Sequence, residues 1–213
     1  MMAHRSSYIR GCGTPRMRAV TLLLCVAALP LAAFAPGVEA AEFKGGALDP
    51  PRPAPDFALR TQDRGEFRLS RHRGDVVVMT FGYTFCPDVC PTTLAELAQV
   101  RASLGGAAKR LRVVFVTVDP ERDSLERLRA YTHAFDRAFV GLTGTPDQLE
   151  RVWKAYGVVA QKRAVPGTAA AYLVDHSAFV YVIDPEGRLR LMFPFGTAIE
   201  DMAHDIKLLL ERR

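Results

Sequence analysis

Two cysteines, Cys86 and Cys90, stand four residues apart in the stretch GYTFCPDVCPTTLAEL, between an apolar run and a helical pattern. Residues four apart at the start of a helix share one face, with their Cβ atoms about 5–6 Å apart. A helix N-terminus also lowers the pKa of a nearby thiol and so favours thiolate nucleophiles and ligands. The residues themselves leave three uses open for the pair: a structural disulfide, a redox couple or part of a metal site.

The spacing of the pair differs from two familiar thiol motifs. Thioredoxin oxidoreductases use Cys-x-x-Cys, whereas this chain has Cys-x-x-x-Cys. Peroxiredoxins place Thr or Ser three residues before the reactive cysteine, but here Tyr83 precedes Cys86 and Pro87 precedes Cys90 at that distance. The sequence therefore carries no peroxidase signal.

A metal site needs more than the two sulfur atoms. Two thiolates cannot complete a structural zinc site, but they suit Cu(I), and with one imidazole they also suit Cu(II). His176 is the histidine placed to join them, because it directly precedes the strand-like run SAFVYVID, with Asp175 beside it. At a strand entrance it could point toward the cysteine loop, or it could cap the strand through hydrogen bonds. The other histidines lie in the leader or in surface-type patterns: His4, His72, His133 and His204.

The elements around these residues alternate between strands and helices. Buried strands are predicted over 75–83 and 111–119, and two more within 177–196, joined by a turn at 184–187. A small hairpin is predicted within 57–70. Helical patterns cover 91–105, 124–135, 145–157 and 198–213, and Thr145 with Pro146 marks a helix start. This order predicts an α/β, thioredoxin-like fold: a central sheet with helices on both faces. It places the cysteines at the first strand-to-helix junction.

The first 40 residues form a leader. A basic start without acidic residues is followed by the uncharged apolar residues 19–35 and a small-residue exit at 38–40. This pattern predicts a cleaved export signal or an N-terminal membrane anchor, and hence a periplasmic location, with a mitochondrial inner-membrane location as the alternative. Met17 is a second candidate start. The Pro-rich residues 41–55 are predicted to be an unfolded tether, and residues 56–213 to form the domain.

Charge argues against a nucleic-acid partner. The net charge is +5, but four of the 28 Lys and Arg and one of the 23 Asp and Glu lie in residues 1–40, which leaves about +2 for the rest.

Three stretches, FGYTFCPDVCPTTLAEL, VFVTVDPERDS and VDHSAFVYVIDPEGRLRL, resemble the Sco/SenC family of copper-delivery proteins. The similarity runs from about Pro55 to the terminal helix. It implies that Cys86, Cys90 and His176 bind copper. The first hypothesis is therefore a copper metallochaperone that binds Cu(I) and Cu(II) through these residues, with Asp175 as a neighbour of the ligand set. It also implies a thioredoxin-like fold and a partner, the copper-bearing subunit of cytochrome c oxidase, whose binuclear centre such proteins help to assemble. The upstream copper donor is not indicated.

A second hypothesis is a thiol–disulfide oxidoreductase. In it Cys86 and Cys90 cycle between dithiol and disulfide and reduce the cysteines of an acceptor. This chemistry has no need of His176, so that residue discriminates between the two hypotheses. Asp119, at the end of a predicted strand, is open to two interpretations: it orients the cysteine loop or a partner, or it forms the turn before Pro120.

Overall fold

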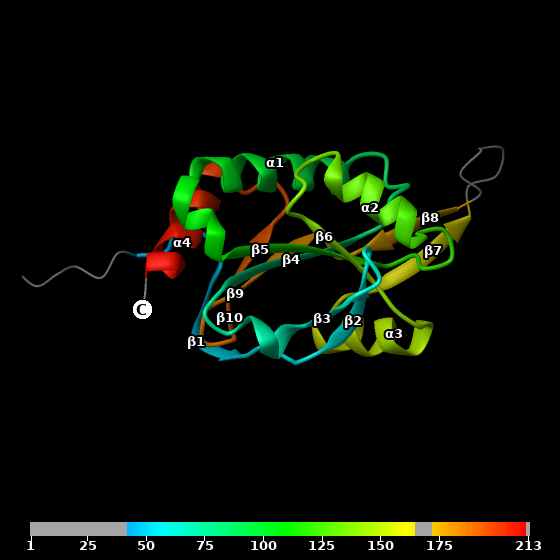
Figure 1. Cartoon of the computed structure of the whole chain (residues 1–213), viewed down its shortest axis with the longest axis horizontal. Helices are drawn as coiled ribbons and strands as arrows, with labels where there is room; N and C mark the ends of the chain where they lie inside the picture. Colours follow the sequence, from blue (N-terminus) through cyan, green and yellow to red (C-terminus); the bar gives the residue numbers. More distant parts are fainter. Residues whose placement is uncertain (1–41, 165–171, 212–213) are drawn as a thin grey trace, which may run out of the picture. The chain divides into compact units, whose positions relative to one another are not determined.

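An eight-stranded sheet runs through the centre of the computed structural model, which describes residues 42–164 and 172–211 (Figure 1). The strand order is β1-β10-β9-β4-β5-β6-β2-β3, and β7 and β8 form a separate two-stranded sheet. The strands are β1 (Ala47–Pro53), β2 (Ala58–Thr61), β3 (Glu66–Arg68), β4 (Val76–Gly82), β5 (Leu111–Thr117), β6 (Val140–Thr143), β7 (Ala160–Ala164), β8 (Tyr172–His176), β9 (Phe179–Ile183) and β10 (Arg188–Pro194).

Helices cover both faces of the large sheet. They are α1 (Val89–Ser103), α2 (Leu125–His133), α3 (Pro146–Ala155) and α4 (Ile199–Glu211), with short 3-10 helices at Leu69–His72 and Gly105–Arg110. In Figure 1, α1, α2 and α4 lie on one side of the sheet and α3 lies on the other. This arrangement confirms the predicted thioredoxin-like plan.

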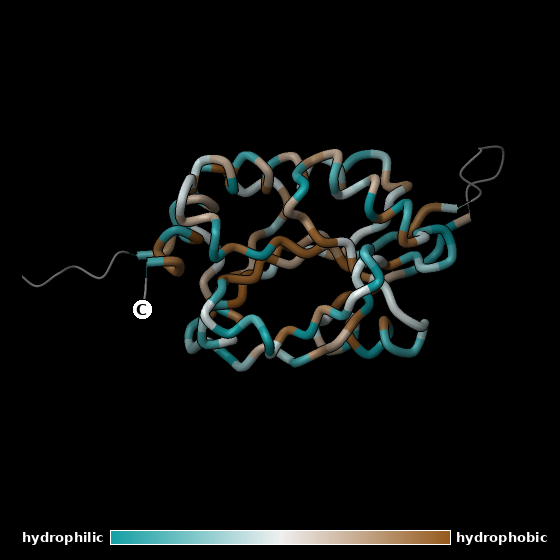
Figure 2. The backbone as a smooth tube through the Cα atoms, viewed as in Figure 1, coloured by the Kyte–Doolittle hydropathy of each residue, from teal (hydrophilic) through white to brown (hydrophobic). Residues whose placement is uncertain are grey.

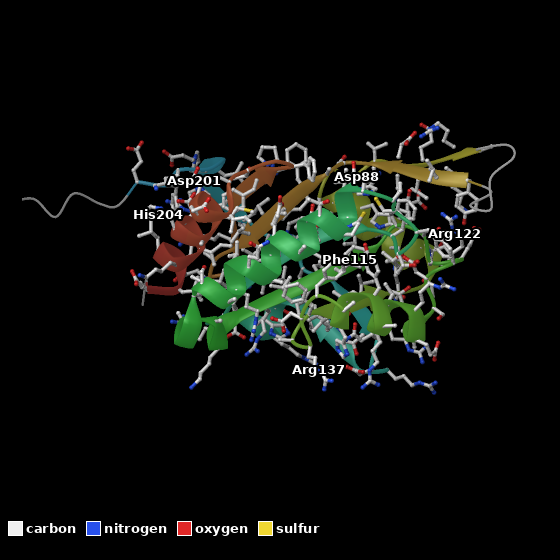
Figure 3. The ribbon with its side chains drawn as sticks, turned by 90° about the horizontal axis from the view of Figure 1, so that it is seen from above. Asp88, Phe115, Arg122, Arg137, Asp201 and His204 are labelled. Carbon is white, nitrogen blue, oxygen red and sulfur yellow. The ribbon has the colours of Figure 1, made fainter. Side chains whose placement is uncertain are left out.

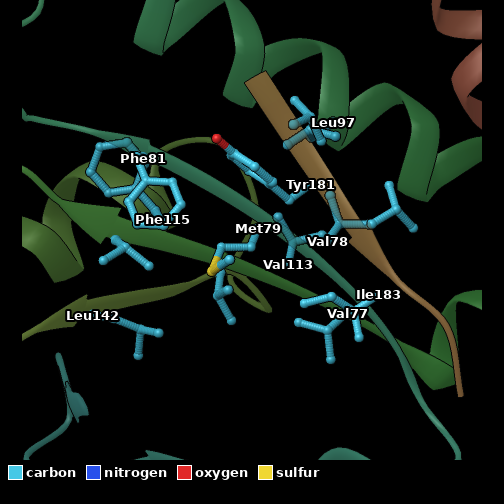
Figure 4. Packing of buried hydrophobic residues seen from close by; sticks show 14 of the residues in the cluster. Val77, Val78, Met79, Phe81, Leu97, Val113, Phe115, Leu142, Tyr181 and Ile183 are labelled. Carbon is cyan, nitrogen blue, oxygen red and sulfur yellow. The ribbon is translucent and has the colours of Figure 1, made fainter. Parts of the chain in front are cut away.

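The centre of the sheet is apolar on both sides. Every residue of β4 is buried, and β4 pairs in parallel with β5 and antiparallel with β9. Figure 2 shows hydrophobic residues concentrated along these central strands, and Figure 4 shows Val78, Met79 and Tyr181 packed in the core. A strand buried on both faces reads as a continuous apolar run because neither side of its pleat meets water. The strand end that carries the cysteine loop is therefore held by the best-packed part of the protein.

Local capping explains where two of the helices begin. The Ser124 side chain accepts a hydrogen bond from the backbone N–H of Arg127 at the start of α2. At the start of α3, Thr145 and Gln148 form a reciprocal capping box with Pro146 in the first turn, as the sequence predicts. In contrast, α1 has no side-chain cap from Asp88.

Part of the Pro-rich segment forms a β-strand. The prediction of an unfolded tether over residues 41–55 is therefore wrong for residues 47–53. They form β1, antiparallel to β10, with Ala47 opposite Leu191 and Pro53 opposite Arg188. Proline cannot donate to a ladder, but an edge strand needs hydrogen bonds on one side only, so its prolines are tolerated there. The fold thus begins before residue 56.

One further feature differs from the sequence-based expectation. Strands β6, β7 and β8 had no predicted counterpart, because they are short and, in β7, exposed and charged.

The predicted leader lies outside the described residues. Within residues 42–164 and 172–211, none of the helices has the length and apolar character needed to span a bilayer.

A buried carboxylate fixes the chain before β1. Asp205 of α4 has no solvent exposure and accepts hydrogen bonds from the backbone N–H groups of Lys44 (2.9 Å) and Gly45 (2.8 Å). His204 Nδ1 lies 2.9 Å from the same carboxylate. Figure 3 shows His204 and Asp201 on α4, at the end where the described chain begins.

We expect Asp205→Ala to lower the free energy of unfolding by about 2 kcal/mol, because it removes a fully buried carboxylate and the hydrogen bonds that it accepts from two partly buried backbone N–H groups. Urea denaturation measures this loss. Asp201→Ala is the control: its carboxylate is exposed and lies 3.6 Å from Lys44 Nζ, so its cost should stay below about 1 kcal/mol. Equal, small losses in both variants would mean that the segment before β1 contributes nothing to the fold.

Candidate metal centre

The first two sulfur atoms come from the junction of β4 and α1. Cys86 lies in the loop after β4, and Cys90 lies in the first turn of α1. The backbone N–H of Cys90 points to Cys86 Sγ at 3.4 Å, and the N–H of Cys86 donates to the Tyr83 carbonyl at 3.1 Å. The sulfur of Cys86 thus accepts a hydrogen bond from a backbone N–H at the start of α1. In most helices a side-chain oxygen is the acceptor at this position.

A glycine allows the second sulfur to approach the strand end. A Cβ on Gly82 would stand 2.7 Å from Cys90 Sγ and 2.7 Å from the Phe115 ring. Both distances are too short for real contacts, so any side chain at position 82 would displace the sulfur or the ring.

His176 reaches the cysteines from the far end of β8. Its Nε2 atom lies 3.5 Å from Cys90 Sγ, and its Nδ1 atom lies 3.1 Å from the Ser177 carbonyl oxygen. A carbonyl only accepts hydrogen bonds, so Nδ1 carries the proton. In the neutral ring Nε2 then presents its lone pair toward the sulfur atoms. This is the protonation state that a metal-binding imidazole requires.

The three side chains form a compact donor set. Within the described part of the chain, Cys86, Cys90 and His176 make the one group of three such residues whose ligand atoms lie within 4.8 Å of one another. Metal–sulfur and metal–nitrogen bonds of about 2.0–2.3 Å around a shared ion place ligand atoms roughly 3.5–4 Å apart. An approach of no more than about 1 Å therefore suffices. Two soft sulfurs and one imidazole suit copper in either oxidation state and leave an open coordination position.

The two thiols differ in protonation. The pKa of Cys86 is lowered to about 4, first by the hydrogen bond from the Cys90 side chain and further by hydrogen bonds from the backbone N–H groups of Asp88 and Cys90. The pKa of Cys90 is raised, because the same hydrogen bond favours its protonated form and because the thiol is buried. At neutral pH the metal-free site therefore holds one thiolate, Cys86, and one thiol, Cys90.

A buried carboxylate that the sequence analysis did not single out holds the cysteine loop. Asp123, with 2% exposure, accepts hydrogen bonds from Thr84 Oγ1 (2.6 Å), the Thr84 backbone N–H (3.2 Å) and Thr117 Oγ1 (2.6 Å). Burial raises the pKa of this carboxyl. It therefore connects the loop after β4 to the end of β5. Its only signal in the sequence was its place in VDPERDS, a stretch in which several acidic residues look alike.

The donor set borders a surface hollow. Cys86 and His176 line it together with Pro87, Asp88, Leu173 and Val174. Cys90 is almost fully buried, with 4% exposure, whereas Cys86 and His176 are half-buried. A molecule in solution would thus meet Cys86 and His176 before Cys90.

Other predicted residues lie elsewhere or act differently. Asp175 points away from the donor set: its exposed carboxylate pairs with Arg163 at 3.0 Å, and the Ser177 carbonyl takes the role of imidazole partner. Asp119 is fully buried and contacts Arg122 and Tyr172. The remaining described histidines bind other groups: His72 stacks on Phe67, His133 bonds to Gln62, and His204 to Asp205. His4 lies outside the described residues.

Cys86 and Cys90 are unbridged thiols in the structure. The reversible disulfide that the sequence suggests for them therefore stays a prediction.

Comparison with known proteins places the chain among similar sequences and folds. The profile of the family described as SCO1/SenC matches residues 46–211. A Stutzerimonas stutzeri protein with a copper-binding description is 35% identical over 142 residues, which are 65% of this chain and 68% of that protein. The solved structure of Bradyrhizobium japonicum ScoI with copper bound is 35% identical, with a TM-score of 0.67, over 73% of this chain and 98% of that one. The apo Sco1 solution structure from Thermus thermophilus is 40% identical, with a TM-score of 0.69, over 81% of this chain and 98% of that one.

Of the two described cysteines, we expect Cys86 and not Cys90 to be alkylated by iodoacetamide in the metal-free protein at about pH 6, at a rate that changes little up to about pH 8. An unperturbed thiol would lose roughly tenfold in thiolate per pH unit below its pKa of about 8.5. Cys90→Ala removes the largest cause of the lowered Cys86 pKa, so the alkylation profile should move to higher pH. Peptide mass spectrometry identifies the modified residue, and an unchanged profile in Cys90→Ala would contradict the assigned cause.

Proposed function

This chain belongs to the SCO1/SenC family, and from that premise we propose that it is a copper metallochaperone. It binds Cu(I) and Cu(II) through Cys86, Cys90 and His176 and delivers the metal to the copper-bearing subunit of cytochrome c oxidase. The observation that carries the proposal is the convergence of two sulfurs and an imidazole nitrogen within 4.8 Å, with the nitrogen lone pair facing inward. The copper-bound structure of a similar protein supports the choice of metal.

The donor set suits both oxidation states for different reasons. Cu(I) accepts low coordination and soft ligands, so the two thiolates satisfy it. Cu(II) prefers a harder donor as well, and His176 supplies it. Because Cys90 is a thiol in the metal-free site, binding of either ion releases its proton to solvent.

Delivery follows from the unequal exposure of the ligands. An acceptor thiolate enters the hollow beside Cys86 and His176 and displaces these ligands first. Cys90, the most buried of the three, releases the metal last. Each exchange replaces one ligand by another, so the ion never loses its whole coordination shell and the barrier stays low.

The leader places this chemistry outside the cytoplasm. We propose that residues 1–40 direct export to the periplasm and that residues 19–35, where they are retained, anchor the protein in the inner membrane. The short segment after residue 40 then links the anchor to the domain, which begins with β1.

The second candidate function is a thiol–disulfide oxidoreductase, favoured by the low pKa of Cys86. The Cys86 thiolate would attack an acceptor disulfide, forming a mixed disulfide and releasing one acceptor thiolate. Cys90, after losing its proton, would attack Cys86 Sγ and release the second acceptor thiolate. The acceptor gains two electrons, and the Cys86–Cys90 pair is oxidised to a disulfide.

We expect His176→Ala to lose Cu(II) binding at least tenfold while Cu(I) binding changes little, because the thiolates alone satisfy the reduced ion. Titration of the reduced protein with each ion, followed by thiolate-to-copper absorption and competition for Cu(I), measures this difference. His72→Ala is the control, since that half-buried histidine packs on Phe67 away from the cysteines. Unchanged Cu(II) binding in His176→Ala would remove this residue from the ligand set. Reductase activity, assayed on the same variant, should be retained if the oxidoreductase chemistry also occurs.

Delivery has its own test. The Cu(I)-loaded protein, mixed with the reduced, metal-free copper-bearing domain of the oxidase and then separated from it, should transfer most of its metal. Cys86→Ser lacks one of the two thiolates that hold Cu(I), so it should load far less Cu(I) and deliver correspondingly less to the acceptor. Copper that stays on the wild-type protein would refute delivery and leave binding intact.

A further inference from the structure

His176, the third ligand, lies on β8, which belongs to the two-stranded sheet and not to the eight-stranded one. Among the described strands, β8 pairs with β7 alone, from Ala160 opposite His176 to Ala164 opposite Tyr172. Figure 1 shows this pair projecting at one end of the fold. Four of the five β7 residues are exposed, and Val174 is the one fully buried residue of β8. Backbone pairing with the large sheet begins only at Phe179, three residues after His176, so the rest of β8 depends on side-chain contacts for its position.

A buried ion pair provides those contacts. Arg122, in the segment between β5 and α2, bonds through Nε to the fully buried carboxylate of Asp119. Its Nη1 donates to the Tyr172 carbonyl at 3.0 Å, and its guanidinium carbon lies 3.7 Å from the centroid of the Tyr172 ring. The Tyr172 hydroxyl closes the triangle by donating to the other oxygen of Asp119 at 2.9 Å. β8 is thus attached at its first residue through backbone, ring and hydroxyl.

The same guanidinium reaches the cysteine loop. It lies 4.8 Å from the centroid of Phe85 and 5.6 Å from that of Tyr83, within the range of cation–π attraction. The Tyr83 ring in turn meets the His176 ring edge to face, with centroids 6.1 Å apart. Arg122 therefore contacts both segments that carry ligands, and Figure 3 shows it near the end of the molecule where they meet.

Burial makes this arrangement specific. The Arg122 side chain is 17% exposed and Asp119 is not exposed at all, so water screens their attraction little. A lysine could keep the charge, but it would lack the planar fork that serves Asp119 and Tyr172 together.

We propose, on the basis of the function proposed above, that Asp119, Arg122 and Tyr172 are positioning residues for the copper centre. They hold β8 against the cysteine loop and so keep His176 Nε2 beside the sulfurs. We call these three residues the latch. Because Cu(II) needs the imidazole and Cu(I) does not, the latch sets the relative affinity of the site for the two oxidation states.

The decisive variants are Arg122→Lys, which keeps the charge, and Tyr172→Phe, which removes one hydroxyl. We expect Arg122→Lys to weaken Cu(II) binding about tenfold or more and Tyr172→Phe to weaken it severalfold, with Cu(I) affinity within about twofold of wild type. In electron paramagnetic resonance, the Cu(II) of Arg122→Lys should lose the coupling to the imidazole nitrogen. Arg101→Lys is the matched control: Arg101 lies near the C-terminal end of α1, about three turns from Cys90, and its half-buried pair at 3.0 Å is with Asp136, after α2.

A double-mutant cycle separates positioning from general stability. In a His176→Ala background, Arg122→Lys should have no further effect on Cu(II) affinity, because a residue that acts through the imidazole has nothing left to position. In the metal-free protein, amide hydrogen exchange should accelerate in β7 and β8 of Arg122→Lys and stay unchanged in β4 and β5.

Three results would overturn the latch: wild-type Cu(II) binding in both Arg122→Lys and Tyr172→Phe, equal losses for Cu(I) and Cu(II), or a loss that persists without His176. If Arg122→Lys does not fold, the result for Tyr172→Phe decides. Failure of the proposed function looks different, since then His176→Ala itself leaves Cu(II) binding unchanged.

Discussion

The site depends on bringing the imidazole of His176 to the sulfurs of Cys90 and Cys86, which lie 86 and 90 residues earlier in the chain. The two sides of this contact are supported very differently. The cysteines sit at the end of β4, the fully buried strand at the centre of the sheet, and Gly82 lets Cys90 pack directly on it. The imidazole sits on a peripheral strand pair with little core of its own. The donor set therefore combines a rigid sulfur side with a nitrogen side whose position depends on a few polar contacts.

Two buried carboxylates supply much of that support. Asp123 receives hydrogen bonds from the cysteine loop and from β5, and Asp119 receives them from Arg122 and Tyr172 on the histidine side. Burying carboxylates is costly unless their oxygens are satisfied, and both are. Placing them beside the site exchanges some stability for fixed loops, so that the ligands are already close before any metal arrives.

Much of the fold could be predicted because its strongest signals are local. The apolar run of β4, the capping pair of α3 and the turn before β10 are each specified by neighbouring residues. Cys86 and Cys90 were identified by their spacing, and His176 by its place before a strand and by family resemblance. Strand β1 was missed because its prolines are typical of a linker, and only its partner β10 makes it a strand. The sequence left two interpretations open for Asp119 and did not single out Asp123, because one short acidic stretch gives no indication of which carboxyl turns inward. Which carboxyl is buried depends on partners elsewhere in the sequence, such as Thr84 for Asp123 and Tyr172 for Asp119.

A sulfur atom accepts a backbone hydrogen bond at the start of α1, so the chemistry of the thiols is coupled to the first turn of this helix. The backbone N–H of Cys90 points to Cys86 Sγ. The side chain of Asp88, the N-cap residue of α1, makes no capping hydrogen bond. Charged acceptors make stronger hydrogen bonds than neutral ones. Oxidation to a disulfide would neutralise this acceptor and loosen the first helical turn. The redox state of two atoms would in this way change the order of the surface that a docking protein meets, without any rearrangement of the sheet beneath.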